Sequence, residues 1–335
     1  MSFVTFGEIM LRLTPSGHAG KIWDANEFAV SFAGSESNVA SSLSFLGNRV
    51  KFITKLPQNH LGKSAIRSLN SFGIDTNSII CGGSRMGTYF IETGSSIRPS
   101  EVIYDRAGSA ISEINAGEFN WIDILNGSSW VFISGITPAL SEQCAKETIL
   151  LASTAKKIGV KVCFDFNFRR ALWKNREKCK RYFTEILQHT DLLCGNQGAM
   201  SDVYGVSFKG DTEAERTTEA MEFVNREFHI GMLAFTLREH ESASRNILSA
   251  MLKVENDFFY SNAYYVDILD RFGTGDAFAA GLLHALEKKW DYEKSVQFAA
   301  AAFALKHTIK GDHHTSSEKE IISIMEGKTL GHVIR

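Results

Sequence analysis

The residues best suited to chemistry in this 335-residue chain form the turn Gly273-Thr274-Gly275, with Asp276 directly after it at the start of an apolar helical pattern. Two glycines allow backbone N–H groups to converge, and a helix N-terminus adds the positive end of its dipole. The turn therefore predicts an anion site with a carboxylate beside it. A plain N-terminal helix cap is the alternative interpretation of the same residues.

Polar residues also gather at other strand ends. Gly34 would allow close backbone approach, and Asn38, further on in the next helix, could hydrogen-bond a polyol, although an ordinary strand–turn–helix junction would look the same. Arg169 follows a strand that ends near Asp165, where open α/β sheets bind ligands, and its guanidinium could pair with a carboxylate or phosphate. A solvated ion-pair cluster is the alternative there. Arg106 is a second candidate for binding a carboxylate.

The elements that must position these residues alternate between strand and helix, which predicts an α/β fold with a mostly parallel sheet covered on both faces. Two helix-free stretches, about 10–32 and 84–106, predict a small separate sheet that acts as a lid on a single domain spanning 1–335. The last two helical patterns are apolar nearly all round, so we expect them to be buried and to hold the glycine turn rigidly. The expected strands are 3–6, 52–54, 130–134, 160–166, 192–194 and 232–237, and the expected helices are 36–46, 61–71, 141–158, 177–188, 212–227, 276–287 and 293–306.

The composition argues against several classes of function. Lys and Arg number 36 against 38 Asp and Glu, and this formal net charge of −2 argues against bulk affinity for nucleic acid or anionic membranes. No apolar run approaches the roughly 20 residues of a membrane helix, and we expect a cytoplasmic protein without a signal peptide. The five scattered cysteines include no CxxC pair, which predicts reduced thiols and no zinc site.

The two histidines after the last apolar helical pattern, His313 and His314, are expected at the surface rather than as ligands.

Taken together, these residues resemble the ribokinase-like (PfkB-type) carbohydrate kinases over essentially the whole chain. Phe6-Gly7-Glu8, the segment Ala33–Asn38 and the segment Asp270–Phe278 follow the two signature regions of that family in order. Within the family the chain is most similar to the 2-keto-3-deoxygluconate kinases, on the segments 104–110, 165–173 and 311–312. The resemblance implies a ribokinase-like fold with a β-sheet lid.

The resemblance also implies a reaction, in which the γ-phosphoryl group of ATP, with Mg²⁺, moves to a hydroxyl of 2-keto-3-deoxygluconate and gives 2-keto-3-deoxy-6-phosphogluconate. Asp276 matches the catalytic base, and the amides of Gly273, Thr274 and Gly275 match the anion hole. The two arginines of the sugar site fall where this subfamily binds the substrate carboxylate, which favours a sugar acid over a neutral sugar. The positions that match the sugar site are Gly34, Asn38, Tyr89, Tyr104, Arg106, Arg169 and Asp312.

The nucleotide side departs from the family pattern. Relatives commonly have Asn-x-x-Glu near the magnesium–phosphate region, but Ala199 stands in place of the acid. Arg238 stands in the usual Lys-x-Gly segment, and Thr274 stands where alanine is usual. Asp270 matches a position that in some relatives helps to hold a monovalent cation such as K⁺. The positions that match nucleotide contacts are Asn196, Thr236, Arg238, Gly273 and Gly275.

Two alternatives to this function remain. The same catalysis could act on fructose, 2-keto-3-deoxygalactonate or a related sugar acid. Because of Ala199 and the Arg238 segment, the chain could instead sense a sugar acid without phosphorylating it, although a sensor has no need of a base such as Asp276. The expected partners are the sugar acid and ATP, with no nucleic acid or membrane, and we expect a homo-oligomer because a lid sheet leaves apolar surface to cover.

Overall fold

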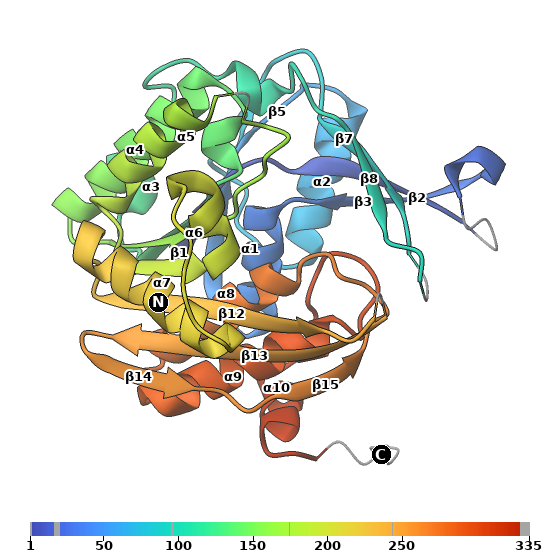
Figure 1. Cartoon of the computed structure of the whole chain (residues 1–335). Helices are drawn as coiled ribbons and strands as arrows, with labels where there is room; N and C mark the ends of the chain where they lie inside the picture. The colour runs from blue at the N-terminus through green and yellow to red at the C-terminus, as the bar shows by residue number, and fades with distance from the viewer. Residues whose placement is uncertain (1, 17–20, 95–96, 174, 243, 329–335) are drawn as a thin grey trace.

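Nine strands form the central sheet of the computed structural model, which describes residues 2–16, 21–94, 97–173, 175–242 and 244–328 (Figure 1). The strands that run parallel to one another are, in spatial order, β4 (Arg49–Ile53), β1 (Ser2–Phe6), β9 (Trp130–Ser134), β10 (Lys161–Asp165), β11 (Leu192–Gly195) and β12 (Met232–His240). The antiparallel strands that extend this sheet are β13 (Arg245–Val254), β14 (Asp257–Tyr260) and β15 (Tyr264–Asp267). The predicted mostly parallel sheet is confirmed, whereas the three antiparallel strands were not predicted.

Helices cover both faces of this sheet because alternate strand residues point to opposite faces. In β1, Val4 and Phe6 belong to one hydrophobic cluster and Phe3 to the other. The helices that contribute to the first cluster are α3 (Trp121–Leu125), α4 (Glu142–Lys157), α5 (Arg176–Leu187), α6 (Gln197–Tyr204) and α7 (Glu213–Phe228). Those that contribute to the second are α1 (Ser35–Phe45), α2 (His60–Ser71), α8 (Thr274–Glu287) and α9 (Tyr292–Lys306), and α10 (Glu318–Met325) packs on α9.

The predicted helices are all present, with ends shifted by no more than two residues, and α8 and α9 are buried as expected. Their starts have a common cause, because most N-cap side chains accept a backbone N–H of the first turn. The helix α8, like α1, differs, since its N-cap is a glycine, Gly273, which has no side chain to cap it. Its first turn is thus open to an external anion.

Within the described residues, none of the helices combines the length and hydropathy needed to cross a bilayer.

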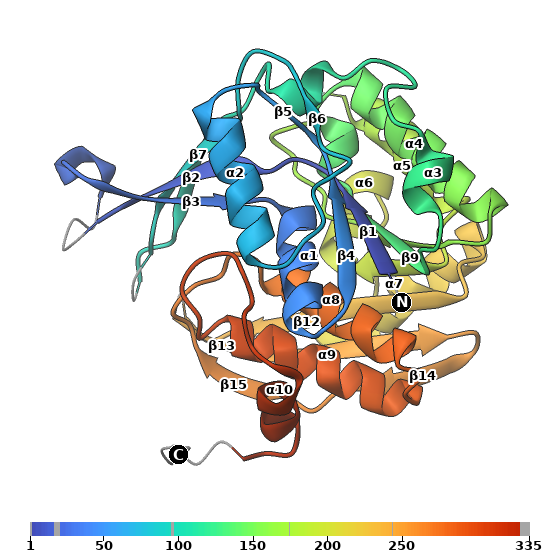
Figure 2. The same ribbon diagram turned by 180° about the vertical axis from the view of Figure 1, so that it is seen from behind.

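A separate four-stranded sheet projects from the central body (Figure 2). It is built from the two helix-free stretches of the sequence, in the order β3 (Phe28–Ala33), β2 (Met10–Pro15), β7 (Thr88–Glu92) and β8 (Glu101–Asp105). A third, two-stranded sheet pairs β5 (Lys55–Leu56) with β6 (Ile80–Cys81). The predicted small sheet therefore exists, and its action as a lid remains a prediction.

Candidate active site

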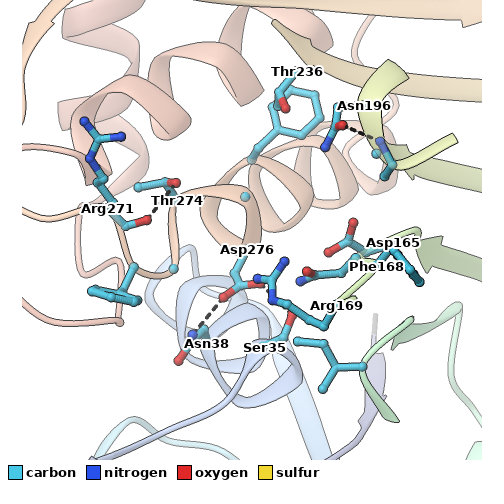
Figure 3. Close-up of a pocket in the computed structure, with 18 of the residues that line it drawn as sticks. Ser35, Asn38, Asp165, Phe168, Arg169, Asn196, Thr236, Arg271, Thr274 and Asp276 are labelled. Carbon is cyan, nitrogen blue, oxygen red and sulfur yellow. Dashed lines mark hydrogen bonds between the residues drawn. The ribbon is translucent and has the colours of Figure 1, made fainter. Parts of the chain in front are cut away.

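A cavity of about 660 Å³ lies at the carboxyl ends of the parallel strands, between the central sheet and the small sheet. Asp165 and Gly195 line it from the ends of β10 and β11, and Thr236 lines it from the middle of β12. Tyr89 and Tyr104 line it from the small sheet, and the turn before α8 forms a further wall (Figure 3). Open α/β sheets bind their ligands at this edge.

Asp276 presents its carboxylate to this cavity. Its Oδ1 accepts a hydrogen bond from Ser35 Oγ and its Oδ2 accepts one from Asn38 Nδ2, both at 2.7 Å (Figure 3). Burial raises the pKa of Asp276 to about 6, and the two hydrogen bonds limit that rise. Because both oxygens bond to α1, the plain-cap interpretation is wrong. A carboxylate held in one orientation, with a pKa near neutrality, is suited to act as a general base.

The turn before Asp276 uses its two glycines for different purposes. Gly273 has a φ of 71°, and a Cβ there would lie 1.8 Å from the carbonyl oxygen of Asp312, so a side chain would separate the turn from that loop. Gly275 lines the cavity, and a Cβ on it would meet no atom of the described residues within 4 Å. Its missing side chain leaves open space at the N-terminus of α8, where an anion is favoured.

Aromatic and charged side chains of the small sheet form the opposite wall. The hydroxyl of Tyr89 donates to Asp312 Oδ1 at 3.1 Å, and the second oxygen of that carboxylate pairs with Arg12. Tyr89 stacks on Tyr104 with ring centroids 6.0 Å apart. The small sheet and the loop that carries Asp312 therefore form one connected wall.

The two arginines predicted to bind a carboxylate differ in their pairing. Arg106 donates through Nε to Glu8 Oε2 at 2.8 Å, and its Nη2 bonds to the same oxygen. Gly34 lies against the backbone of Glu8, since a Cβ there would lie 1.9 Å from the Glu8 carbonyl oxygen. Arg169 lines the cavity without a salt bridge of 4.0 Å or less to any described residue. Burial raises the pKa values of the nearby Asp165 and Asp276, the positive charge of Arg169 opposes that rise, and Figure 3 shows its guanidinium beside Asp276. Arg169 is therefore the stronger candidate for binding a carboxylate.

The predicted nucleotide contacts lie along another part of the same cavity. Asn196 Oδ1 accepts the backbone N–H of Ala199 at 2.9 Å and so caps α6. Thr236 and Arg238 line the cavity from β12. Burial lowers the pKa of Arg238 to about 10, so its guanidinium is still charged at neutral pH. Its Nη2 lies 3.4 Å from His307 Nε2.

Comparison with known proteins agrees with this geometry. The profile of the pfkB family carbohydrate kinases matches residues 2–319. The chain belongs to this family. It is 31% identical over 331 residues to the 2-dehydro-3-deoxygalactonokinase of Haloferax volcanii, with 98% of both chains covered. It is 26% identical to the 5-dehydro-2-deoxygluconokinase of Clostridium botulinum, over 94% of this chain and 90% of the other.

Among solved structures, the 2-dehydro-3-deoxygluconokinase of Thermotoga maritima has a TM-score of 0.94 and 40% identity to this pfkB family kinase, over 98% of each chain. The predicted ribokinase-like fold is thereby confirmed. The described residues of the kinase hold no cluster of three or more His, Cys, Asp or Glu side chains suited to a metal ion.

The predicted K⁺ site at Asp270 does not fit the kinase. Asp270 Oδ2 accepts from Arg12 Nη2 at 3.3 Å and from the backbone N–H of Gly311 at 2.8 Å, and Oδ1 accepts from the backbone N–H of Phe272 at 3.0 Å. Both carboxylate oxygens are therefore bonded to donors of the protein. Asp270 joins the anion turn to the loop after α9 rather than presenting oxygens to an ion.

The surface position expected for the two histidines of this loop is wrong. His314 is buried, and His313 bonds through Nε2 to the carbonyl oxygen of Phe32 at 2.8 Å. Its Nδ1 lies 2.9 Å from Ser41 Oγ. The reason is that the loop after α9 packs against β3 and α1, which no local sequence signal shows.

Sequence reasoning gave no role to three residues that the structure brings to the site. Arg12 was missed because a charged residue on a short strand is usually solvated, yet β2 turns it inward onto Asp312. Asp165 lines the cavity, where burial and the nearby charge of Asp276 raise its pKa to about 7. Lys306 ends a helix that reads as apolar, and it is buried. Only Asp165, at a strand end, had a usable signal.

Proposed function

We propose that this kinase phosphorylates 2-keto-3-deoxygluconate with ATP and gives 2-keto-3-deoxy-6-phosphogluconate. The observation that carries the proposal is the meeting, in one cavity, of an oriented base at Asp276, a glycine anion turn and the guanidinium of Arg169. Similarity to the kinases of two epimeric keto-deoxy sugar acids supports the same substrate class. A sugar carboxylate would offer the Arg169 guanidinium a charge-assisted hydrogen-bond acceptor that a neutral sugar lacks.

In this mechanism the substrate hydroxyl oxygen attacks the γ-phosphorus, the bond to the bridging oxygen of ADP breaks, and the hydroxyl proton passes to Asp276. Ser35 and Asn38 fix the orientation of the accepting carboxylate. The open amides at the start of α8 stabilise the charge on the transferred group. Arg169 holds the sugar carboxylate, and Arg106, already paired with Glu8, adds its remaining N–H groups.

ATP would lie over the end of β11 and the second half of β12, where Asn196, Thr236 and Arg238 line the cavity. Arg238 would supply the positive charge that relatives take from a lysine. Mg²⁺ would enter with the phosphates, because Ala199 offers no ligand. We place this reaction in the cytoplasm, the compartment that supplies ATP and keeps free thiols reduced.

We also propose that the kinase self-associates through the outer face of its small sheet. Pairing aligns Val30, Leu13, Phe90 and Ile103 as one apolar row across all four strands. Val30 and Ile103 are 61% and 48% exposed. The opposite face of the same sheet lines the cavity, so the body of the chain does not bury the apolar outer face. The same face of a second copy is also apolar and would bury it.

Sedimentation equilibrium tests this association. The double variant Val30→Asp with Ile103→Asp should shift the mass to that of a monomer, whereas Ile158→Asp, which changes an exposed apolar residue at the end of α4, should not. An unchanged mass for the double variant, or a monomeric unaltered protein, would contradict the proposed interface.

An ADP-release assay tests the reaction. The acceptors are 2-keto-3-deoxygluconate, its C4 epimer 2-keto-3-deoxygalactonate, gluconate, fructose and ribose. We expect turnover only on the keto-deoxy acids, with the gluconate epimer preferred. Preference for fructose or ribose would refute a sugar-acid substrate. Binding of the acid by calorimetry without ADP release would show that the chain is a sensor, as Ala199 and Arg238 suggest.

A further inference from the structure

A cluster of four buried charges lies directly behind the anion turn. Its carboxylates are Asp270 and Asp312, and its cations are Arg12 and Lys306. Arg12 comes from β2, Asp270 precedes the turn, and the other two lie at the end of α9 and in the loop after it. The cluster therefore contains two carboxylates and two cationic groups, all of them side chains of the protein.

The ammonium group of Lys306 is surrounded as a bound monovalent cation would be. Lys306 is 0% exposed, and its Nζ donates to the carbonyl oxygens of Ile309 at 2.9 Å and Gly311 at 2.6 Å. Burial lowers the pKa of Lys306, and the carboxylates of Asp270 and Asp312 oppose that change. Backbone carbonyl oxygens commonly replace the hydration shell of potassium in proteins.

Protein donors also use the remaining oxygens of this cluster. The two Asp270 oxygens bond to Arg12 and to backbone N–H groups, and one Asp312 oxygen pairs with Arg12. The backbone N–H groups of Leu269 and Asp270 both donate to the carbonyl oxygen of His307, at 2.9 and 3.1 Å. An added ion would have to displace at least one of these donors.

The cluster is mechanically connected to the anion turn. Lys306 bonds to Gly311, and the next residue, Asp312, places its carbonyl oxygen against Gly273. Only a glycine allows that approach, so any movement of the loop moves the turn. Because Asp276 follows three residues after Gly273, the position of the base depends on this contact as well.

We propose that Lys306, with Arg12, is a built-in replacement for a monovalent cation: its ammonium group holds the loop 309–312 against the anion turn, so the kinase requires no potassium. Lys306 is thus a positioning residue. The inference rests on the proposed kinase function for its rate measurements, but its ion-binding consequence does not.

The first test uses the unaltered protein. Its rate with ATP, Mg²⁺ and 2-keto-3-deoxygluconate is measured in tetramethylammonium buffer and then with potassium, sodium or ammonium at constant ionic strength. We expect equal rates in all of these salts. Severalfold activation by potassium over tetramethylammonium would overturn the proposal, because it would show that an open cation site exists.

The second test removes the ammonium group. Lys306→Ala should lower kcat by about 10²-fold, the size of effect expected when reacting groups are misplaced by about 1 Å. Potassium, ammonium or a short alkylammonium ion should restore a large part of the loss, whereas tetramethylammonium should not. Lys310→Ala, which changes an exposed lysine of the same loop, is the matched control and should behave as the unaltered protein. A folded, inactive Lys306→Ala variant that no cation rescues would refute the cation role.

A third measurement needs no substrate. Potassium should raise the thermal unfolding midpoint of Lys306→Ala and of the milder variant Lys306→Met, and leave that of the unaltered protein unchanged, because a ligand stabilises only the state that binds it. If the kinase assay fails on every sugar while this ion dependence is observed, the proposed function is wrong and the cation inference stands. Midpoints that respond equally in all proteins would refute the inference.

Discussion

The proposed sugar side and the proposed nucleotide side of the cavity are organised differently. On the sugar side, polar side chains bond to one another before any substrate is present, as Asn38 does with Asp276 and Tyr89 does with Asp312. On the nucleotide side, Arg238 has a buried Nε without a partner in the described residues, and Ala199 has no polar atom in its side chain. The comparison teaches that the sugar side is preorganised for chemistry, whereas the nucleotide side supplies mainly charge and space.

The largest effect on the rate should come from Asp276, the proposed base on the sugar side. Asp276→Asn should lower kcat by about 10³-fold, because general base catalysis and the oriented oxygen pair are lost together. Circular dichroism and calorimetric binding of the sugar acid show whether the variant is folded and still binds. Retention of more than a tenth of the ADP-release rate would exclude Asp276 as the base.

The second largest effect should come from Arg169. Arg169→Ala should reduce kcat/KM for 2-keto-3-deoxygluconate by about 10²-fold, since a charge-assisted pair with the carboxylate is lost. Initial rates measure this, with Arg170→Ala as the control, because the neighbouring Arg170 is exposed and pairs with Asp202 instead. Equal losses in the two variants would remove the carboxylate assignment.

The pH dependence of kcat/KM should distinguish the role of Asp276 as the base from the role of Ser35, which orients it. Below about pH 6 Asp276 is protonated, so kcat/KM should fall tenfold per pH unit there. The hydrogen bond from Ser35 favours the charged carboxylate, and therefore Ser35→Ala should raise the pKa and move the acid limb to higher pH. Ser35→Ala should therefore lower kcat/KM by about tenfold near pH 6 and by less near pH 8. Ser37→Ala, which removes a hydroxyl bonded to the Gly34 carbonyl, should leave the limb in place.

The smallest effect should lie on the nucleotide side. Arg238→Ala should raise KM for ATP by about three- to tenfold, with little change in KM for the sugar acid, because it removes uniform phosphate binding. Arg238→Lys keeps the charge and should restore most of the affinity. A loss confined to kcat would instead assign Arg238 to stabilisation of the transferred phosphoryl group.

Local sequence signals predicted a large part of the fold and the site. Strand and helix periodicity is a property of neighbouring residues, so the parallel strands and the principal helices were found close to their observed ends. The anion turn and Asp276 were predicted because two glycines before an apolar helix restrict the backbone locally. The antiparallel strands β13 to β15 were missed because their sequence has no comparable separating helix.

Partnerships between distant residues could not be predicted. Arg12 and Asp312 are 300 positions apart in the chain, and Arg12 and Asp270 are 258 apart. Whether Asp270 holds a potassium ion or an arginine depends on which side chain the fold brings to it. The same holds for Arg106, whose predicted freedom to bind a carboxylate is reduced by Glu8.

The sequence by itself determined the α/β alternation, the small sheet and the glycine turn with Asp276 after it, because each depends on residue types within a few positions of one another. The tertiary structure alone decided which charges are neutralised and which remain available. Burial and pairing set the charge state of a group, and both depend on residues that the fold brings together from distant parts of the chain. Arg169 is therefore available to a substrate, while Lys306 is bonded within the protein.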